Sequence, residues 1–266
     1  MSFRAGLQRH KRIVVKVGTT TLTYANGKLN FKLMDKLCMV LTDLRNQGKD
    51  VILVSSGAIA VGADRLGLAE RPRDIPGKQA ASAVGQAVLI QIYENFFINY
   101  NQKTAQILLT RDVMEQEHLR DNARNTFFTL LSLGVIPIVN ENDTISVEEL
   151  GFSENDNLSA RVACLADAEL LILLSDQDGM YDEDPGKNPQ ARLIPVVDGI
   201  TADVEAMAGD SASALGTGGF AAKVGAAKMA NAQGIDVVVA SGADPEVLFD
   251  ILAGAEKGTL FRGRRE

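Results

Sequence analysis

The sequence predicts an α/β fold, a three-layer αβα sandwich in which helices cover both faces of a mainly parallel sheet. Short runs rich in β-branched residues alternate with longer stretches whose apolar residues recur at helical spacing. The short runs are apolar throughout, which is typical of strands buried on both faces of a parallel sheet. Of the 266 residues, 46% are hydrophobic and 23% are charged, which is the composition of a globular protein with a large core.

The first half of the chain contains two short apolar runs, residues 13–17 (IVVKV) and 51–54 (VILV), which we expect to be strands. Between them, residues 31–44 repeat leucine and valine every three or four positions, which predicts an amphipathic helix. A glycine-led segment at residues 57–66 is expected to open a second helix directly after the second strand. Residues 78–100 are expected to form a long helix that is rich in apolar side chains.

The second half continues the same alternation of strands and helices. We expect strands at residues 106–109, 135–139, 170–174 (LLILL), 236–240 (DVVVA) and 258–261. We expect helices at residues 120–133, 157–166 and 220–233. Because no shift in composition resembling an interdomain linker separates these elements, we expect residues 1–266 to form a single domain.

Charge and composition limit the function classes. The chain carries 34 acidic and 27 basic side chains, a net charge of −7, which argues against a general nucleic-acid binder. No stretch reaches the roughly 18 apolar residues of a membrane-spanning helix, so no membrane partner is expected. Cys38 and Cys164 lie in apolar helical patterns and are interpreted as buried, reduced thiols, which fits a cytosolic protein. His10 and His118 lack metal or triad spacing and are interpreted as surface residues.

Polar and glycine residues follow four of the expected strands. The segments are Gly18-Thr19-Thr20-Thr21, Ser55-Ser56-Gly57-Ala58, Asn140-Glu141-Asn142-Asp143 and Ser175-Asp176-Gln177-Asp178-Gly179. In open α/β sheets, ligands bind at the carboxyl ends of the strands, where these four segments would converge. Gly18 and Gly57 would let backbone N–H groups approach an anion, helped by a following helix N-terminus. Any one segment alone has the alternative interpretation of an ordinary turn or helix cap.

Lys16 is unusual because it lies inside the apolar run of residues 13–17. A buried ammonium group is costly unless an anion accompanies it, so its position points to a phosphate-binding role. The alternative is a lysine on an edge strand whose ammonium group reaches solvent.

A glycine-rich segment, LGTGGFAAK at residues 215–223, leads into an expected helix. It partly matches the dinucleotide-binding pattern, but no strand precedes it, and it is not a phosphate-binding loop of the Walker type. It offers an anion-binding loop with Lys223 in the first helical turn; the alternative is a surface loop. Asn155-Asp156-Asn157 precedes another expected helix, where it would cap the helix or bind a polar substrate and orient lysines.

Together these groups suit phosphoryl transfer. That reaction needs positioning and positive charge where the attacking, transferred and leaving oxygens share negative charge. Lys16 and Lys223 would supply the charge from opposite sides, and a carboxylate such as Asp156 would hold both lysines in place. Magnesium would bridge the phosphates of the nucleotide.

The same residues and motifs resemble the amino acid kinase family, and within it the members that phosphorylate glutamate. The resemblance runs from about residue 13 to residue 261. It depends on the segments VVKVGTTTL, VSSGAIAVG, KQAASAVGQ, LLTRDVM, NARNT, PIVNENDT, NDNLSA, DPGKNPQA and GDSASALGTGGFAAK. Most specific is the combination of VNENDT, NDNLSA and GTGG with its following lysine. Ser175 stands where members often have threonine, and either residue supplies a hydroxyl group.

The resemblance implies the amino acid kinase fold and ATP-dependent phosphorylation of the γ-carboxylate of L-glutamate to L-glutamyl 5-phosphate, the first step of proline biosynthesis. It implies that Lys16 and Lys223 stabilise the transferring phosphoryl group and that Asp156 organises them. Ser56, Gly57, Asp143 and Asn155 fall on substrate-binding positions, and Glu141 with Asp143 would receive the ammonium group. The implied ATP-binding residues are Lys16, Gly18, Ser175, Asp176, Thr217, Gly218, Gly219 and Lys223.

The resemblance also implies Mg²⁺ carried by ATP, with no metal ligand from protein side chains. It implies a cytoplasmic homo-oligomer, a dimer or tetramer, that is inhibited by proline and coupled to glutamyl-phosphate reductase. Many bacterial members carry a further small domain of the PUA type, found in RNA-modification enzymes. Here we expect residues 1–266 to be one catalytic domain without it.

Two alternatives remain at this stage. A sister kinase on the same fold would accept N-acetylglutamate, aspartate, carbamate or uridylate (UMP), and its ATP-binding half would look alike. A non-catalytic sensor of an amino acid or nucleotide would need no catalytic lysines, and the presence of Lys16, Lys223 and Asp156 disfavours it.

Overall fold

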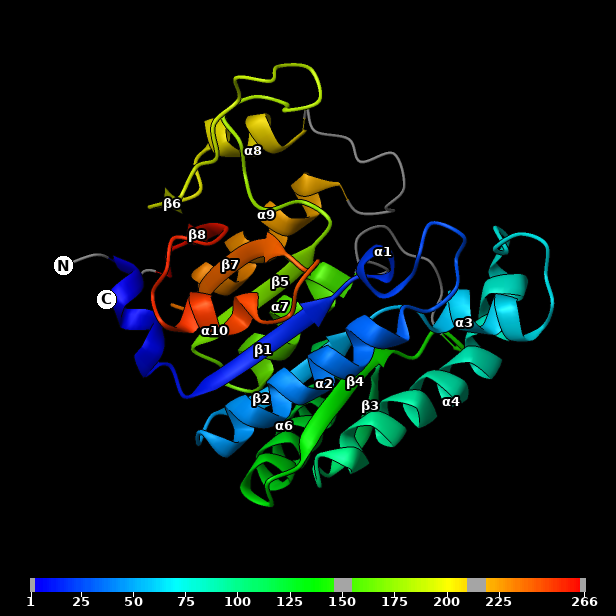
Figure 1. Ribbon diagram of the computed structural model, residues 1–266. Helices are drawn as coiled ribbons and strands as arrows, with labels where there is room; N and C mark the ends of the chain where they lie inside the picture. Colours follow the sequence, from blue (N-terminus) through cyan, green and yellow to red (C-terminus); the bar gives the residue numbers. More distant parts are fainter. Residues whose placement is uncertain (1–2, 146–154, 210–218, 264–266) are drawn as a thin grey trace.

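A computed structural model describes residues 3–145, 155–209 and 219–263 (Figure 1). Within this part of the chain, eight strands form one sheet in the order β3-β4-β2-β1-β5-β7-β8-β6. All neighbouring strands are parallel except β7 and β8, which run antiparallel. The strands are β1 (Arg12–Val17), β2 (Asp50–Ser55), β3 (Thr104–Leu109), β4 (Ile136–Glu141), β5 (Leu170–Ser175), β6 (Val196–Val197), β7 (Asp236–Ser241) and β8 (Thr259–Phe261).

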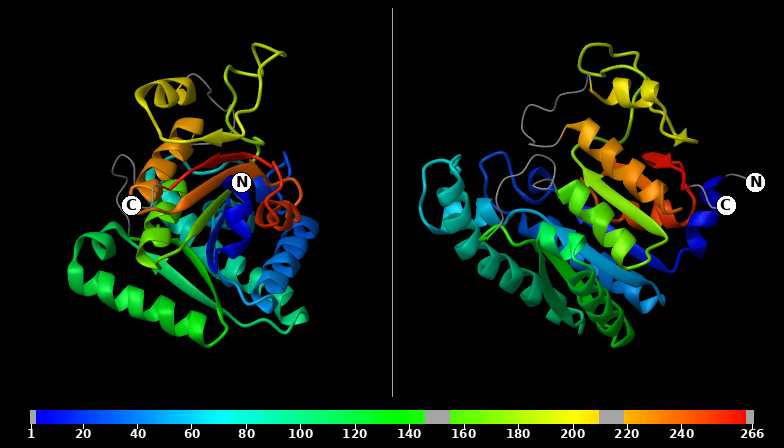
Figure 2. Two further views of the ribbon diagram at one scale, coloured as in Figure 1. Left: turned by 90° about the vertical axis from the view of Figure 1, so that its left-hand side faces the viewer. Right: turned by 180° about the vertical axis from the view of Figure 1, so that it is seen from behind.

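Helices pack on both faces of this sheet. One face is covered by the 3₁₀ helix η1 (Phe3–Arg9), α2 (Phe31–Asn46), α4 (Ile75–Asn99) and α10 (Val247–Leu252). The other is covered by α6 (Glu117–Ser132), α7 (Asn155–Leu165) and α9 (Phe220–Asn231), which come to the front in the reversed view of Figure 2. The remaining described helices are α1 (Thr19–Leu22), α3 (Ala58–Arg65), α5 (Arg111–Glu115) and α8 (Ala202–Gly209).

The alternation of side chains along the strands explains the three layers. In β1, Ile13 and Val15 belong to the core under α2 and α4, whereas Val14 belongs to the core under α6, α7 and α9. All three side chains are fully buried, because both faces of the sheet are covered. The same alternation places Lys16 on the α7–α9 face of the sheet.

These observations confirm the expected fold class and each expected strand and helix, with ends that shift by a few residues. The expected helix at residues 157–166 begins at Asn155, so Asp156 lies in its first turn rather than before it. The short elements η1, α1, α5, α8, α10 and β6 were not anticipated from the sequence. No helix in the described ranges combines the length and apolar character of a membrane span.

The topology also locates a ligand crevice. From β1 the chain proceeds to β2, β3 and β4 on one side, whereas β5 lies on the other side of β1 and leads to β7. The direction of winding therefore reverses between β1 and β5. Ligands bind at such switch points, beyond the carboxyl ends of the strands. The segments after β1, β2, β4 and β5 meet at this edge.

Two interpretations from the sequence are wrong in part: that both histidines lie on the surface, and that both cysteines are buried. His10 is buried rather than on the surface, and its Nε2 lies 2.9 Å from Asp236 Oδ2 at the start of β7. His118 is exposed, as expected. Cys38 is fully buried, whereas Cys164 is only partly buried on α7. Burial raises the pKa of both thiols, which keeps them protonated.

Helices α3 and α4 approach closely through Gly62 and Gly85. A Cβ atom at Gly85 would lie 1.9 Å from the carbonyl oxygen of Ala58, and one at Gly62 would lie 1.7 Å from the carbonyl oxygen of Ala81. Both contacts are with backbone atoms, which cannot move aside as a flexible side chain can. Because Ala58 belongs to the segment after β2 and lines the ligand crevice, this packing holds α4 beside that crevice.

Replacing Gly85 with alanine is therefore expected to lower the free energy of unfolding by about 3 kcal/mol, the upper end of typical overpacking costs. Chemical denaturation of the purified variant measures the change. Gly225→Ala is the matched control, since a Cβ there would meet only Asn157 Oδ1, at 4.0 Å, on an exposed helix position. We expect this control to be neutral or to stabilise by up to about 1 kcal/mol. Equal stability of the two variants would refute the close-packing argument.

Candidate active site

A cavity of about 770 Å³ lies at the carboxyl ends of the strands, where the winding reverses. Gly18 links β1 to α1, and Ser56 and Gly57 link β2 to α3. Gly57 has φ +110°, a left-handed conformation that glycine adopts without strain. The turn therefore directs α3 away from the sheet and leaves its first N–H groups beside the cavity.

Two lysines and one aspartate form a buried cluster of charges in the site. Lys16 Nζ lies 2.6 Å from Asp156 Oδ1, and Lys223 Nζ donates to Asp156 Oδ2 at 3.2 Å. The side chains are about nine-tenths or more buried, yet all three line the cavity. One carboxylate thus holds two ammonium groups at the cavity wall.

Three distant segments of the chain supply this cluster. Lys16 comes from the central strand β1, Asp156 from the first turn of α7 and Lys223 from the first turn of α9. Because β1 lies between β2 and β5, the interpretation of Lys16 as an edge-strand lysine is wrong. Burial by itself would raise the pKa of Asp156, but the two ammonium groups outweigh it and hold the pKa below its ordinary value.

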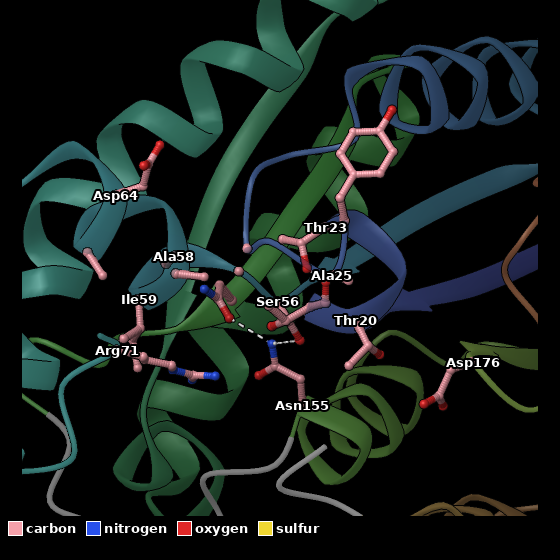
Figure 3. Close-up of a pocket in the computed structure, with 18 of the residues that line it drawn as sticks. Thr20, Thr23, Ala25, Ser56, Ala58, Ile59, Asp64, Arg71, Asn155 and Asp176 are labelled. Atoms are coloured by element: carbon pink, nitrogen blue, oxygen red, sulfur yellow. Dashed lines mark hydrogen bonds between the residues drawn. The ribbon is translucent and has the colours of Figure 1, made fainter. Parts of the chain in front are cut away.

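A second set of polar side chains forms a hydrogen-bonded row beside the lysine cluster. Asn155 Nδ2 donates to Ser56 Oγ and to Asn140 Oδ1, both at 2.9 Å (Figure 3). Asn140 Nδ2 in turn donates to Gln86 Oε1 of α4 at 2.9 Å. This row fixes the amide of Asn155 at the cavity and ties α7 to β2, β4 and α4.

Asp143 lies just after β4 and lines the same cavity. Ser82 Oγ of α4 donates to Asp143 Oδ2 at 2.8 Å. Burial raises the pKa of Asp143, opposed by the hydrogen bond from Ser82 and by the positive charge of Arg71. A partly buried carboxylate with one oxygen held by a hydroxyl group is suited to receive a cationic group of a ligand.

The end of β5 connects this cavity to a second one. Ser175 and Asp176 line the first cavity, and Ser175 Oγ donates to Asp176 Oδ1 at 3.0 Å. Asp176 also lines a neighbouring cavity of about 630 Å³, whose wall includes Tyr181 and Phe220. The two cavities therefore share a wall at the carboxyl end of β5.

The structure brings together most of the residues selected from the sequence. The cavity-lining ones are Lys16, Gly18, Ser56, Gly57, Asp143, Asn155, Asp156, Ser175, Asp176 and Lys223. Gly219 is the N-cap residue of α9 and is not among the described residues that line this cavity. Thr217 and Gly218 lie outside the described residues. Glu141 is buried at the end of β4 and, in the part of the chain described, does not line the cavity beside Asp143.

Sequence reasoning missed Ser82, Gln86 and Arg71. A signal for the first two was present, because Ser82 and Gln86 are polar residues four positions apart within an otherwise apolar helix. That spacing places them on one face of α4. Arg71 lies in the polar connection between α3 and α4, where no pattern distinguishes it from an ordinary surface arginine.

Comparison with known proteins agrees with this geometry. The sequence pattern of the amino acid kinase family matches residues 11–241, which includes the lysine cluster and every strand from β1 to β7. This chain belongs to the amino acid kinase family. The expected family is therefore confirmed.

Similar proteins have specific names within the family. A protein named glutamate 5-kinase from Clostridium perfringens is 51% identical over 266 residues, which covers 98% of this chain and 99% of that protein. Proteins of the same name from Listeria monocytogenes serotype 4b (strain F2365) and Enterococcus faecalis are each 48% identical. These two matches cover 99% and 97% of this chain and 97% of each relative.

Solved structures share the fold at low sequence identity. UMP kinase from Bacillus anthracis has a TM-score of 0.63 with 17% identity, covering 96% of this chain and 97% of that one. Isopentenyl phosphate kinase from T. acidophilum has a TM-score of 0.60 with 18% identity, covering 94% and 100%. At this level of sequence identity, the likeness establishes the fold alone. The acceptor substrate has to be inferred from the residues of the site.

Proposed function

We propose that this protein is a kinase that transfers the γ-phosphoryl group of ATP to the γ-carboxylate of L-glutamate. The products are L-glutamyl 5-phosphate and ADP, and the reaction is the first step of proline biosynthesis. The assignment of the acceptor is supported by relatives about half identical over nearly the full chain. The cluster of Lys16, Asp156 and Lys223 is the observation that carries the chemistry.

The lysine cluster is suited to in-line phosphoryl transfer. A carboxylate oxygen of glutamate attacks the γ-phosphorus, the bond to the bridging oxygen of ATP breaks, and ADP leaves with the electron pair. The substrate carboxylate is already ionised near pH 7, so no general base is needed. Lys16 and Lys223 stabilise the negative charge that spreads over the transferring group. Asp156 fixes both ammonium groups before the substrates arrive, so they need not reorganise during the step.

The acceptor is bound by the hydrogen-bonded pair Ser56 and Asn155 and by Asp143. Ser56 and Asn155, joined by a hydrogen bond, and the N–H groups after Gly57 orient the reacting end of glutamate near Lys16. Asp143 receives the ammonium group, and Ser82 keeps that carboxylate oriented. This division places the reacting carboxylate and the ammonium group at different parts of the same cavity.

The nucleotide occupies the opposite side, beyond the ends of β1 and β5. Its phosphates lie against Lys16, Gly18 and Lys223, and its nucleoside enters the second cavity past Ser175 and Asp176. Thr217, Gly218 and Gly219 complete the phosphate-binding loop of the proposal.

Magnesium belongs to the nucleotide in this arrangement. Both oxygens of Asp156 already face ammonium groups, which fits a cation held by phosphate oxygens rather than by this carboxylate. When bound with the nucleotide, Mg²⁺ would neutralise part of the negative charge of its phosphates. On the resemblance to the family, we also propose that residues 1–266 are one catalytic domain and that the protein is a cytoplasmic homo-oligomer. On the same basis we propose that proline inhibits it and that it is coupled to glutamyl-phosphate reductase.

An assay with ATP, Mg²⁺ and hydroxylamine tests the acceptor. Hydroxylamine converts an acyl phosphate to a coloured hydroxamate, while ADP is measured in parallel. We expect hydroxamate and ADP with L-glutamate, and neither product above background with N-acetylglutamate, aspartate, carbamate or UMP. Turnover with one of those acceptors instead would reassign the substrate and keep the lysine mechanism. No turnover with any of them would favour the sensor interpretation.

A further inference from the structure

Arg71 is a cation of the acceptor cavity that the proposed mechanism does not use. It lies in the connection between α3 and α4, and its side chain extends toward Asn155 in Figure 3. Lys16, Lys223 and Arg71 are the cationic side chains among the described residues that line this cavity. The two lysines face Asp156, whereas Arg71 makes no hydrogen bond or ion pair with any residue in the described ranges.

The position of Arg71 relative to Asp143 defines its electrostatic role. Its positive charge acts on Asp143 and opposes the effect of burial on that carboxylate. Asp143 has one oxygen held by Ser82 of α4, and Asp143 and Arg71 line the same cavity. A carboxylate and a guanidinium group that has no ion-pair partner among the described residues therefore line the same cavity, without forming an ion pair with each other.

This juxtaposition matches the backbone end of an amino acid. In glutamate the ammonium group and the α-carboxylate are attached to the same carbon atom, so the two groups must bind within a few ångströms of each other. An α-carboxylate beside Asp143 is repelled unless a cation accompanies it. A guanidinium group binds a carboxylate with two parallel hydrogen bonds, which adds geometric selectivity to the charge.

We propose that Arg71 binds the α-carboxylate of the amino-acid acceptor, while Asp143 binds its ammonium group. This inference rests on the proposed function and specifies how that site recognises its substrate. Arg71 then selects acceptors that carry a free α-carboxylate next to a free ammonium group. The γ-carboxylate of the same molecule is thereby left to point toward Lys16.

Kinetics of Arg71→Gln test this assignment. Hydrogen bonds to charged groups are worth about 1.5–3 kcal/mol, which corresponds to a roughly 10- to 150-fold rise in KM for L-glutamate. We expect KM for ATP to stay within about twofold, because Arg71 lies on the acceptor side. Arg73→Gln is the matched control: Arg73 is two positions away, has a side chain that is 93% exposed, and is absent from the described lining of the cavity. It should behave as the wild type.

A substrate analogue identifies the group that Arg71 contacts. L-Glutamic acid α-amide keeps the ammonium group and the γ-carboxylate but lacks the α-carboxylate charge. We expect the wild type to lose a similar factor in kcat/KM with this analogue, and Arg71→Gln to show no additional loss with it. The two changes should thus be non-additive, as expected for partners in one contact.

The outcomes separate this inference from the proposed function. If Arg71→Gln leaves KM for glutamate within twofold, or lowers kcat/KM equally for glutamate and its α-amide, the assignment of Arg71 is wrong and the proposed function stands. If the wild type forms no hydroxamate with glutamate, both are wrong. Normal KM for ATP in a variant with weakened glutamate binding distinguishes a local effect from misfolding.

Discussion

Replacing Lys223 with alanine is expected to lower kcat by roughly 10²–10³-fold, the loss typical of removing one donor to a developing negative charge. Lys223 lies at the cavity wall with its ammonium group 3.2 Å from Asp156 Oδ2. Its charge acts on the transferring group more than on bound substrates, so kcat should fall more than the affinity for glutamate. Steady-state kinetics of ADP formation, with both substrates varied, measure the effect.

Lys228→Ala is the control for this prediction. Lys228 belongs to the same helix α9, but its side chain is exposed and pairs with Glu205. We expect Lys228→Ala to have nearly wild-type kinetics, because exposed ion pairs contribute little. A Lys223→Ala enzyme that remains within twofold of wild-type kcat would contradict the role assigned to this lysine.

Replacing Asp156 with asparagine is expected to reduce both stability and activity. The substitution leaves the ammonium groups of Lys16 and Lys223 buried without their shared anion. Removing one partner of a buried ion pair costs about 3–5 kcal/mol, and we expect a loss of that size in the free energy of unfolding. Because the lysines lose their anchor, kcat should fall as well.

Urea denaturation across a range of pH measures the stability change. The pKa of Asp156 is held below its ordinary value, so its contribution is present above that ordinary pKa and is lost as pH falls through the folded-state pKa. The difference between wild type and Asp156→Asn should therefore shrink in acid. Asp167→Asn is the control, since Asp167 pairs with Arg124 on the surface and should cost less than about 1 kcal/mol. Equal losses in the two variants would contradict the special role of the buried cluster.

The layered fold could be predicted because the main strands carry apolar residues on both faces, a pattern that few other structures produce. Helices long enough for several turns can be recognised from apolar residues that recur at helical spacing. Short elements such as α1 and α10, of four and six residues, show too little periodicity to be distinguished from turns. The order of the strands, and hence the switch point at β1 and β5, depends on pairings between distant segments.

The site could be predicted where polar and glycine segments follow the strands, where motifs resemble the family, and where a residue contradicts its surroundings. Lys16 was recognisable because a charge within an apolar strand needs an anion. Its partner could not be derived from spacing, because Asp156 lies 140 positions away and meets it only in the folded chain. His10 was misread for the same reason, since its contact with Asp236 at the far end of the sequence forms only in the folded chain.

The most direct test of the whole account follows one oxygen atom. Glutamate labelled with ¹⁸O in both oxygens of the γ-carboxylate is incubated with the enzyme, ATP, Mg²⁺ and hydroxylamine, and the released inorganic phosphate is analysed by mass spectrometry. If the γ-carboxylate attacks the γ-phosphorus, hydroxylamine cleavage at the acyl carbon leaves one ¹⁸O in each phosphate. The account predicts phosphate that carries one ¹⁸O atom, in an amount equal to that of ADP. Phosphate without ¹⁸O would show that water, rather than the carboxylate, attacks ATP, and would contradict the proposed reaction.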